Sequence, residues 1–203
     1  MKKNILMLVA IAAITACNKK ENTVVDHSAD QSEMAAPVDS AATPGDSVST
    51  SSTSSETASL NDQDRKFADA AAKGGLMEVM AGELAAKNAT NSTVKKLGEM
   101  MVKDHSKANE ELKQWASKTA YTLPAGLDTD QQKSYDDLKA KKGADFDRMY
   151  TDMMVKDHEK TIADFKKEAA DGSEASLKNF ATKTLPTLDH HLMESKKAKD
   201  AVK

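Results

Sequence analysis

The sequence predicts an all-α protein, in which an antiparallel four-helix bundle carries a short extra helix between its two hairpins. Three observations lead to this prediction. Residues that favour helices dominate the composition, and only 4% of the residues are aromatic, which argues against a β-sandwich or a β-barrel. Apolar residues recur at helical spacing from about residue 61 onward. Short polar stretches at residues 88–91 and 171–173 separate long helical segments, as the tight turns of two hairpins would.

The helices are expected to follow one another with few residues between them. We expect helices over residues 62–87, 92–119 and 130–141, a fourth that ends near residue 170, and a fifth that starts beyond it. Pro124 and Gly126 mark the loop before the short third helix, and Gly143 breaks that helix. Ser173 has the residue type of an N-cap for the fifth helix.

Residues 1–16 have the pattern of a secretory signal peptide. Lys2 and Lys3 precede an apolar run from Ile5 to Ile14 that is too short for a permanent membrane span. The segment Ile-Thr-Ala-Cys that ends at Cys17 resembles the lipobox of bacterial lipoproteins, and this resemblance implies cleavage before Cys17 and lipid attachment to it. Asn18 then favours the outer membrane of the cell envelope. The alternative is a cleaved signal and a soluble mature protein.

Residues 17–60 are expected to form the lipidated cysteine and a disordered tether, followed by the bundle domain at residues 61–203. Twelve of the twenty positions from Ser40 to Ser59 are Ser or Thr, and residues 18–60 contain no aromatic side chain. Such a segment cannot bury enough apolar surface to offset the entropy lost on ordering. We therefore expect a flexible spacer between membrane and domain.

Charge and residue usage exclude or disfavour several classes of function. The net charge is -3 and no basic patch with interleaved aromatic residues is present, so nucleic-acid binding is not expected. Cys17 is the only cysteine, which excludes an internal disulfide and cysteine-based metal sites. The sequence offers no nucleophile–base pair, phosphate-binding loop or paired catalytic carboxylates, so an enzyme is not favoured. It also identifies no protein partner.

A six-residue repeat lies near the middle of two predicted helices. Met-Met-Val-Lys-Asp-His occurs at residues 100–105 and again at residues 153–158. Because six consecutive identities are improbable by chance, the repeat suggests that the two hairpins are related copies.

Each long helix is expected to place one ionisable side chain on its apolar face. Offsets of three, four, seven and eleven residues share a helix face, which puts Glu78, His105, His158 and His191 among apolar residues. The neighbours on the four faces are Phe67, Ala71, Gly74, Ala81, Ala85, Val94, Leu97, Met101, Leu112, Tyr150, Met154, Ile162, Phe165, Leu177, Ala181 and Leu188.

Two interpretations of these four residues remain open. Three imidazoles and one carboxylate form a suitable ligand set for Zn²⁺ or Fe, because a carboxylate buried in a bundle core must be paired or bound to metal. Alternatively, the four residues form a polar core layer that contains no metal. If a metal binds, Asp104, Asp157, Tyr150 and His190 are the candidates for the surrounding shell that orients its ligands.

The methionines offer a further alternative, a thioether site for Cu(I). Met is more often used to fill cores. The residues concerned are Met77, Met101, Met149, Met153 and Met154.

Taken together, several motifs resemble those of one bacterial family. These are the Lys-Asp-His repeat, Gly-Gly-Leu-Met-Glu-Val at residues 74–79, and Leu-Pro-Thr-Leu followed two residues later by His-Leu at residues 185–192. They are similar to the ferritin-like family of unknown function whose members are described as predicted outer-membrane or exported proteins. The resemblance covers about residues 62–198 and implies a ferritin-like bundle with Glu78, His105, His158 and His191, or His190 in its place, at recurring polar positions.

The sequence departs from true ferritins in one important respect. Di-iron bundles use Glu-x-x-His on two helices, whereas the residues three before His105, His158 and His191 are Val102, Val155 and Leu188. Ferroxidase chemistry is therefore disfavoured. The leading hypothesis is a lipid-anchored envelope protein that binds one transition-metal ion, and the rival is a structural or interaction module with a metal-free polar layer.

Overall fold

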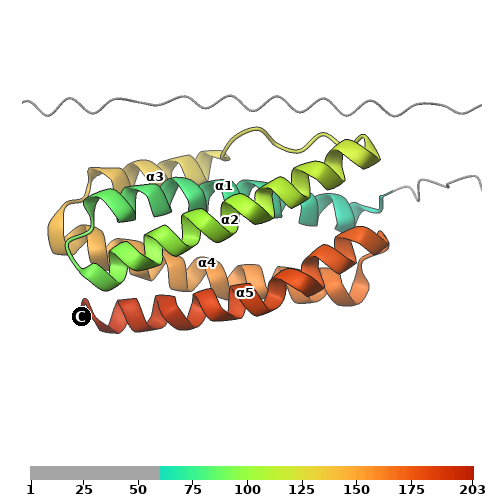
Figure 1. Ribbon diagram of the computed structural model, residues 1–203. Coiled ribbons are helices and arrows are strands. Elements are labelled where there is room, and N and C mark those ends of the chain that lie inside the picture. Colours follow the sequence, from blue (N-terminus) through green and yellow to red (C-terminus); the bar gives the residue numbers. More distant parts are fainter. Residues whose placement is uncertain (1–59) are drawn as a thin grey trace, which may run out of the picture. The chain divides into compact units, whose positions relative to one another are not determined.

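The computed structural model describes residues 60–203, which contain five helices (Figure 1). Their bounds are α1 Asp62–Asn88, α2 Ser92–Thr119, α3 Thr129–Ala140, α4 Gly143–Asp171 and α5 Ala175–Asp200. These bounds lie within a few residues of those predicted from the sequence. The predicted signal peptide, the lipidation site at Cys17 and the tether up to residue 59 lie outside the described residues. Of the helices in residues 60–203, none is long and apolar enough to cross a membrane.

Local capping interactions define where the first three helices begin. Asn61 caps α1 by accepting a hydrogen bond from the backbone N–H of Asp64, whose carboxylate in turn accepts from the N–H of Asn61. Asn91 caps α2 through the N–H of Thr93, and Asp128 starts α3 with a second reciprocal box. These side chains satisfy N–H groups that the first turn of a helix leaves unpaired.

Gly143 is a breaker, as predicted, and it is also the first residue of α4. Its φ of 58° lies in the left-handed region, which glycine adopts without the steric cost of a Cβ atom. The chain therefore turns sharply between α3 and α4. This turn lets α3 lie against α1 and α4 at the side of the bundle (Figure 1).

The four long helices form two hairpins that pack together as a four-helix bundle, as predicted. Helix α1 pairs with α2 and α4 with α5, while α1 also packs against α4 and α2 against α5 (Figure 1). Helices α2 and α4 are therefore diagonal across the bundle. The connection between them contains α3 and runs the length of the bundle, so α2 and α4 point in the same direction (Figure 1).

The diagonal arrangement changes the interpretation of the repeat. Its two copies lie on α2 and α4, which are the second helix of one hairpin and the first helix of the other. A duplicated hairpin would place the copies on corresponding helices, so the repeat does not support that interpretation. Instead, the copies bring His105 and His158 towards the bundle axis from opposite corners.

The apolar core of the described residues consists of two clusters. One cluster contains Ala81, Ala85, Ala89, Val94, Leu97, Met101, Leu138, Phe146, Tyr150, Met154 and Ala198. The other contains Phe67, Ala68, Leu112, Trp115, Ala116, Ile162, Phe165, Leu177, Ala181 and Leu188. In α2 and α4 the buried histidine falls between a methionine of the first cluster and an apolar residue of the second. The predicted polar residues thus form a layer between two apolar regions.

Each hairpin also holds the turn of the other. Asp147 of α4 accepts hydrogen bonds from the backbone N–H and hydroxyl of Thr90 and from the N–H of Asn91, in the α1–α2 turn. At the opposite end, Asp64 of α1 accepts from the N–H and hydroxyl of Ser173, in the α4–α5 turn. The prediction of Ser173 as an N-cap is therefore wrong. Glu174 caps α5 instead, because Asp64 takes the Ser173 hydroxyl.

Candidate metal centre

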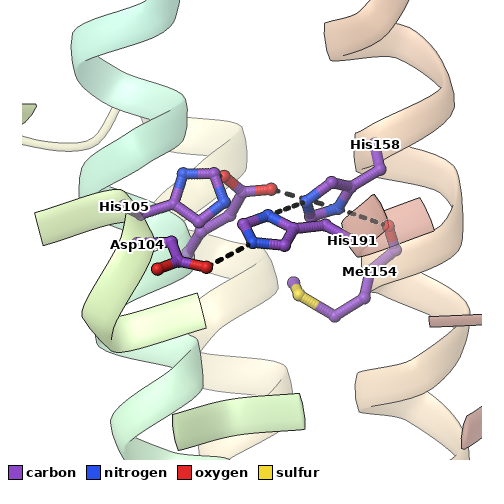
Figure 2. A network of polar contacts seen from close by, with 6 residues as sticks. Asp104, His105, Met154, His158 and His191 are labelled. Atoms are coloured by element: carbon purple, nitrogen blue, oxygen red, sulfur yellow. Dashed lines mark hydrogen bonds and ion pairs between the residues drawn. The ribbon is translucent and has the colours of Figure 1, made fainter. Parts of the chain in front are cut away.

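The structure brings the four predicted core residues together. Glu78 comes from α1, His105 from α2, His158 from α4 and His191 from α5, and their exposed fractions are 3%, 6%, 0% and 1%. The ring centroids of the three histidines lie 5.1–5.6 Å apart. Figure 2 shows the three rings turned towards one another at the centre of the bundle. Four helices separated in sequence therefore meet in one polar layer.

Glu78 contacts two of the histidines directly. Its Oε2 lies 2.9 Å from Nδ1 of His105, and its Oε1 lies 3.3 Å from Nδ1 of His158. The geometry at Oε1 is too poor for a hydrogen bond, and among residues 60–203 this oxygen has no hydrogen-bond partner. Glu78 therefore lies behind His105 and His158 and orients their rings.

Glu78 is ionised in the folded protein. Burial by itself raises the pKa of the carboxyl group, but the positive charge available on His105 and His158 outweighs burial and lowers that pKa to about 2. Burial likewise lowers the pKa of His105, yet the charge of Glu78 and its hydrogen bond outweigh burial, and the pKa is raised. His105 and Glu78 therefore form a buried ion pair when His105 carries two protons. Metal binding at His105 requires loss of the second proton.

Groups that can only accept hydrogen bonds fix which nitrogen of each ring carries a proton. The carboxylate of Glu78 faces Nδ1 of His105, so this nitrogen donates. The backbone carbonyl of Met154 lies 2.9 Å from Nδ1 of His158, which donates to it. The carboxylate of Asp104 lies 3.0 Å from Nε2 of His191, which donates to it (Figure 2). The remaining nitrogens are Nε2 of His105, Nε2 of His158 and Nδ1 of His191.

Two of the remaining nitrogens, on His158 and His191, face each other in the interior of the layer. Nε2 of His158 and Nδ1 of His191 are 3.3 Å apart, and one nitrogen from each of the three rings fits within a set whose members lie within 4.8 Å of one another. Nε2 of His105 is buried and has no hydrogen-bond partner in the described part of the chain. Burial is the largest influence that lowers the pKa of His191 to about 4, and the Asp104 hydrogen bond only partly opposes it. His191 is therefore neutral at neutral pH, with a free lone pair on Nδ1.

This arrangement fits a transition-metal ion. Two imidazole nitrogens bound at 2.0–2.1 Å to one tetrahedral ion would lie about 3.3 Å apart, which matches the distance between His158 and His191. Histidine ligands of metals usually donate their other N–H to a carboxylate or a carbonyl, as all three rings do here. His105, His158 and His191 would hold the ion, whereas Glu78 would support two of them rather than complete the ligand set.

The other predicted residues occupy different positions. Asp104 bonds His191 on α5, and not the adjacent His105. Asp157 is partly buried without a contact to a histidine ring, and burial, aided by the charge of Glu78, raises its pKa to about 6. Tyr150 is fully buried, and no hydrogen-bond partner for its hydroxyl is found in residues 60–203. Burial raises the pKa of Tyr150, and so does the charge of Glu78. His190 is exposed on the outer side of α5.

The sequence reasoning missed two features of the centre. The first is the pairing of Asp104 with His191, which follows from the packing of α2 against α5. A signal was present, because a residue one position before His105 is rotated by about 100° and faces a neighbouring helix. The second is the Met154 carbonyl, for which the sequence carries no signal, since every residue has a backbone carbonyl.

Comparisons with known proteins identify the domain. The sequence profile of the family described as a domain of unknown function, DUF4142, matches residues 49–198. The fold is similar to the solved structure "CopM in the Cu(II)-bound form", with a TM-score of 0.58 and 16% sequence identity over 69% of this chain and 96% of that chain. At this identity the similarity concerns the fold. No curated protein matched the chain.

Proposed function

We propose that this chain, which belongs to the DUF4142 family of domains of unknown function, binds one copper ion through His105, His158 and His191. One observation carries the proposal. Three buried imidazoles from three helices bring one nitrogen each into one space, while Glu78, Asp104 and the Met154 carbonyl accept hydrogen bonds from their other nitrogens. Buried polar atoms without partners are rare in folded proteins, and the free Nε2 of His105 is explained by a bound ion.

Two arguments favour copper over the Zn²⁺ or Fe expected from the sequence. Imidazole nitrogens suit zinc, iron and copper alike, but divalent copper binds a given nitrogen site more tightly than the other first-row divalent ions do. The solved structure with the similar fold holds Cu(II). A bound copper ion supplies a centre that changes between two oxidation states, which suits a role in metal handling or in the response to metal stress. The protein residues hold their rings in place and exclude water from the layer.

The competing proposal is a polar core layer without metal. The Glu78–His105 ion pair favours it, because this pair satisfies both charges without any ion. In that case the chain is a structural or interaction module. A metal-free layer explains the facing nitrogens of His158 and His191 as a hydrogen bond of 3.3 Å, and it leaves the free Nε2 of His105 unexplained.

We also propose that the domain is held at the cell envelope, in the outer membrane, by lipid on Cys17. The support is the sequence alone: a positive start, an apolar run and a lipobox-like segment that ends at Cys17. Labelled palmitate incorporated into the wild-type chain and not into the Cys17→Ser variant would establish the anchor. Equal labelling of both chains would contradict it.

Metal analysis of the full chain, purified without a histidine tag from cells supplied with copper, zinc and iron, tests the function. We expect about one equivalent of copper, lost in His191→Ala and retained in His190→Ala, which changes the adjacent but exposed histidine. Circular dichroism establishes that both variants fold. Zinc or iron at this stoichiometry would refute copper and keep the site. A folded protein that binds no metal and gains no thermal stability from added metal would support the polar layer.

A further inference from the structure

The methionines singled out in the sequence separate into two groups in the structure. Met101 and Met154 are fully buried in the first apolar cluster and fill the core. Met77, Met149 and Met153 instead line one cavity of about 720 Å³. Met77 is 3% exposed, yet in the described residues it belongs to neither apolar cluster. Met149 and Met153, partly buried, also pack against the first apolar cluster, so core filling accounts for them in part and leaves Met77 unexplained.

The cavity exists because the facing surface of α1 carries almost no side-chain volume. Ala70, Ala71, Gly74 and Gly75 line it along two turns of the helix. A Cβ atom added to Gly74 would meet nothing within 4 Å among the described residues. The small residues on this face of α1 thus leave space next to the region where α1 packs against α4.

The cavity leads to the histidine layer. Glu78, which follows Met77 in the sequence, and His105 both form part of its lining. Met149 and Met153 are four residues apart on α4, so their side chains project from the same face, one helical turn from each other. Helices α1 and α4 pack directly, which brings thioethers from both into the same space.

The lining has the chemistry of a site for a soft monovalent cation. Thioether sulfur is a soft ligand that selects Cu(I) over hard ions, and it carries no charge of its own. The carboxylates of Glu78 and Asp157 line the same cavity and offset the charge of a cation. Three lysines line the cavity: Lys73 is paired with Asp128 at 3.4 Å and Lys160 with Asp164 at 2.7 Å, which reduces their repulsion of a cation, whereas the exposed Lys156 forms no ion pair in the described residues.

We propose that Met77, Met149 and Met153 form a second metal site, a thioether site for Cu(I) in the cavity beside the histidine layer. The site is separate from the three histidines in its ligands and in the oxidation state it favours. It rests on the proposed function in one respect, namely that copper is the metal the domain handles. The two sites together would let one bundle hold copper in either oxidation state.

Competition with bicinchoninate for Cu(I), without oxygen, tests the proposal. The measurements use the full chain carrying His191→Ala, so that the histidine layer contributes little. Replacing Met77, Met149 and Met153 by Leu should weaken Cu(I) binding by roughly tenfold or more, whereas Met101→Leu, in the core, should leave the affinity unchanged. Unchanged affinity in the triple variant, or no Cu(I) retained by the parent chain, would overturn the proposal.

Two further measurements separate this proposal from the proposed function. If the triple variant does not fold, the pair Met149→Leu and Met153→Leu, both only partly buried, should still weaken Cu(I) binding measurably. In the otherwise native chain, the triple variant should keep its equivalent of Cu(II). If the native chain binds no Cu(II), the histidine site is refuted. If the methionine variants of that same chain also lose Cu(I) binding, the thioether site is still supported.

Discussion

Glu168 provides a quantitative test of how burial and charge act in this bundle. It lies near the α4–α5 turn beside Asp64, and it is 1% exposed. One of its oxygens accepts a hydrogen bond from Gln63 at 3.4 Å, the other has no donor in residues 60–203, and the carboxyl group lies against that of Asp64. Asp64, by contrast, accepts hydrogen bonds from the hydroxyl and the N–H of Ser173 and from the N–H groups of Asn61 and Glu174. Burial raises the pKa of Asp64, but these hydrogen bonds outweigh burial and hold the pKa below its usual value.

Burial raises the pKa of Glu168 from 4.5 to about 7, with the hydrogen bond and the charge of Asp64 adding to the rise and the hydrogen bond from Gln63 opposing it. The folded protein therefore binds this proton more tightly than the unfolded chain does. The resulting stabilisation is fully present below about pH 4.5 and is lost as the pH rises through about 7. A shift of this size corresponds to about 3 kcal/mol, and solvent near the turn reduces the expected loss to about 2 kcal/mol.

The perturbation is Glu168→Gln, which is neutral at every pH and keeps an amide facing Gln63. Urea unfolding followed by circular dichroism at about pH 5 and about pH 8 gives the free energy of unfolding of both chains. We expect the variant to be more stable than the wild type by about 2 kcal/mol at the higher pH, and similar to it at the lower pH. Glu159→Gln, on the exposed face of α4, is the control. If the free energy of unfolding changes between the two pH values by the same amount in the variant and in the wild type, Glu168 is ionised in the folded state at both pH values, and the reasoning is refuted.

Three other predictions follow from specific contacts. Asp104→Ala should weaken metal binding by about 10- to 100-fold in a titration with Cu(II), because it removes the acceptor that fixes the His191 ring; unchanged affinity would show that the hydrogen bond is dispensable. Asp147→Ala should lower the free energy of unfolding by about 2–3 kcal/mol in urea, since it leaves N–H groups of the α1–α2 turn unpaired; a loss below about 0.5 kcal/mol would contradict this. Gly98→Ala should lower the melting temperature, because the added Cβ would lie 2.7 Å from the Gly82 carbonyl oxygen. Gly74→Ala should instead raise the free energy of unfolding by up to about 1 kcal/mol, since its added Cβ meets no neighbour among the described residues. A higher melting temperature for Gly98→Ala than for Gly74→Ala would refute the packing argument.

The sequence predicted the parts of the structure that depend on periodicity. Glu78, His105, His158 and His191 could be assigned to the inner faces because each lies at helical spacing from apolar neighbours. Their approach to a single layer could also be predicted, since tight turns set the relative heights of neighbouring helices. The same reasoning could not distinguish a ligand from an orienting residue. The role of Glu78 depends on whether its oxygens face the interior of the layer or the Nδ1 atoms, a difference of a few ångströms.

Features that depend on contacts between hairpins could not be predicted. The Met-Met-Val-Lys-Asp-His repeat was a real signal, but that its copies bring His105 and His158 in from opposite corners depended on which helices are diagonal in the bundle. Ser173 had the right residue type for a cap, and only the position of Asp64, about 110 residues earlier, explains why its hydroxyl points elsewhere. The cavity beside Glu78 arises from the small residues around Gly74, whose effect depends on which helix they face.

The exchange of turn contacts has a consequence for assembly. The α1–α2 turn is completed by Asp147 of the second hairpin, and the α4–α5 turn by Asp64 of the first. Either hairpin alone therefore has a turn whose N–H groups lack their acceptor, so each half is finished only by docking with the other. The histidine layer forms at the same moment, because its four residues come from both halves. Docking of the hairpins is thus linked to the construction of the centre, because the α4–α5 hairpin carries only His158 and His191 and the α1–α2 hairpin supplies His105.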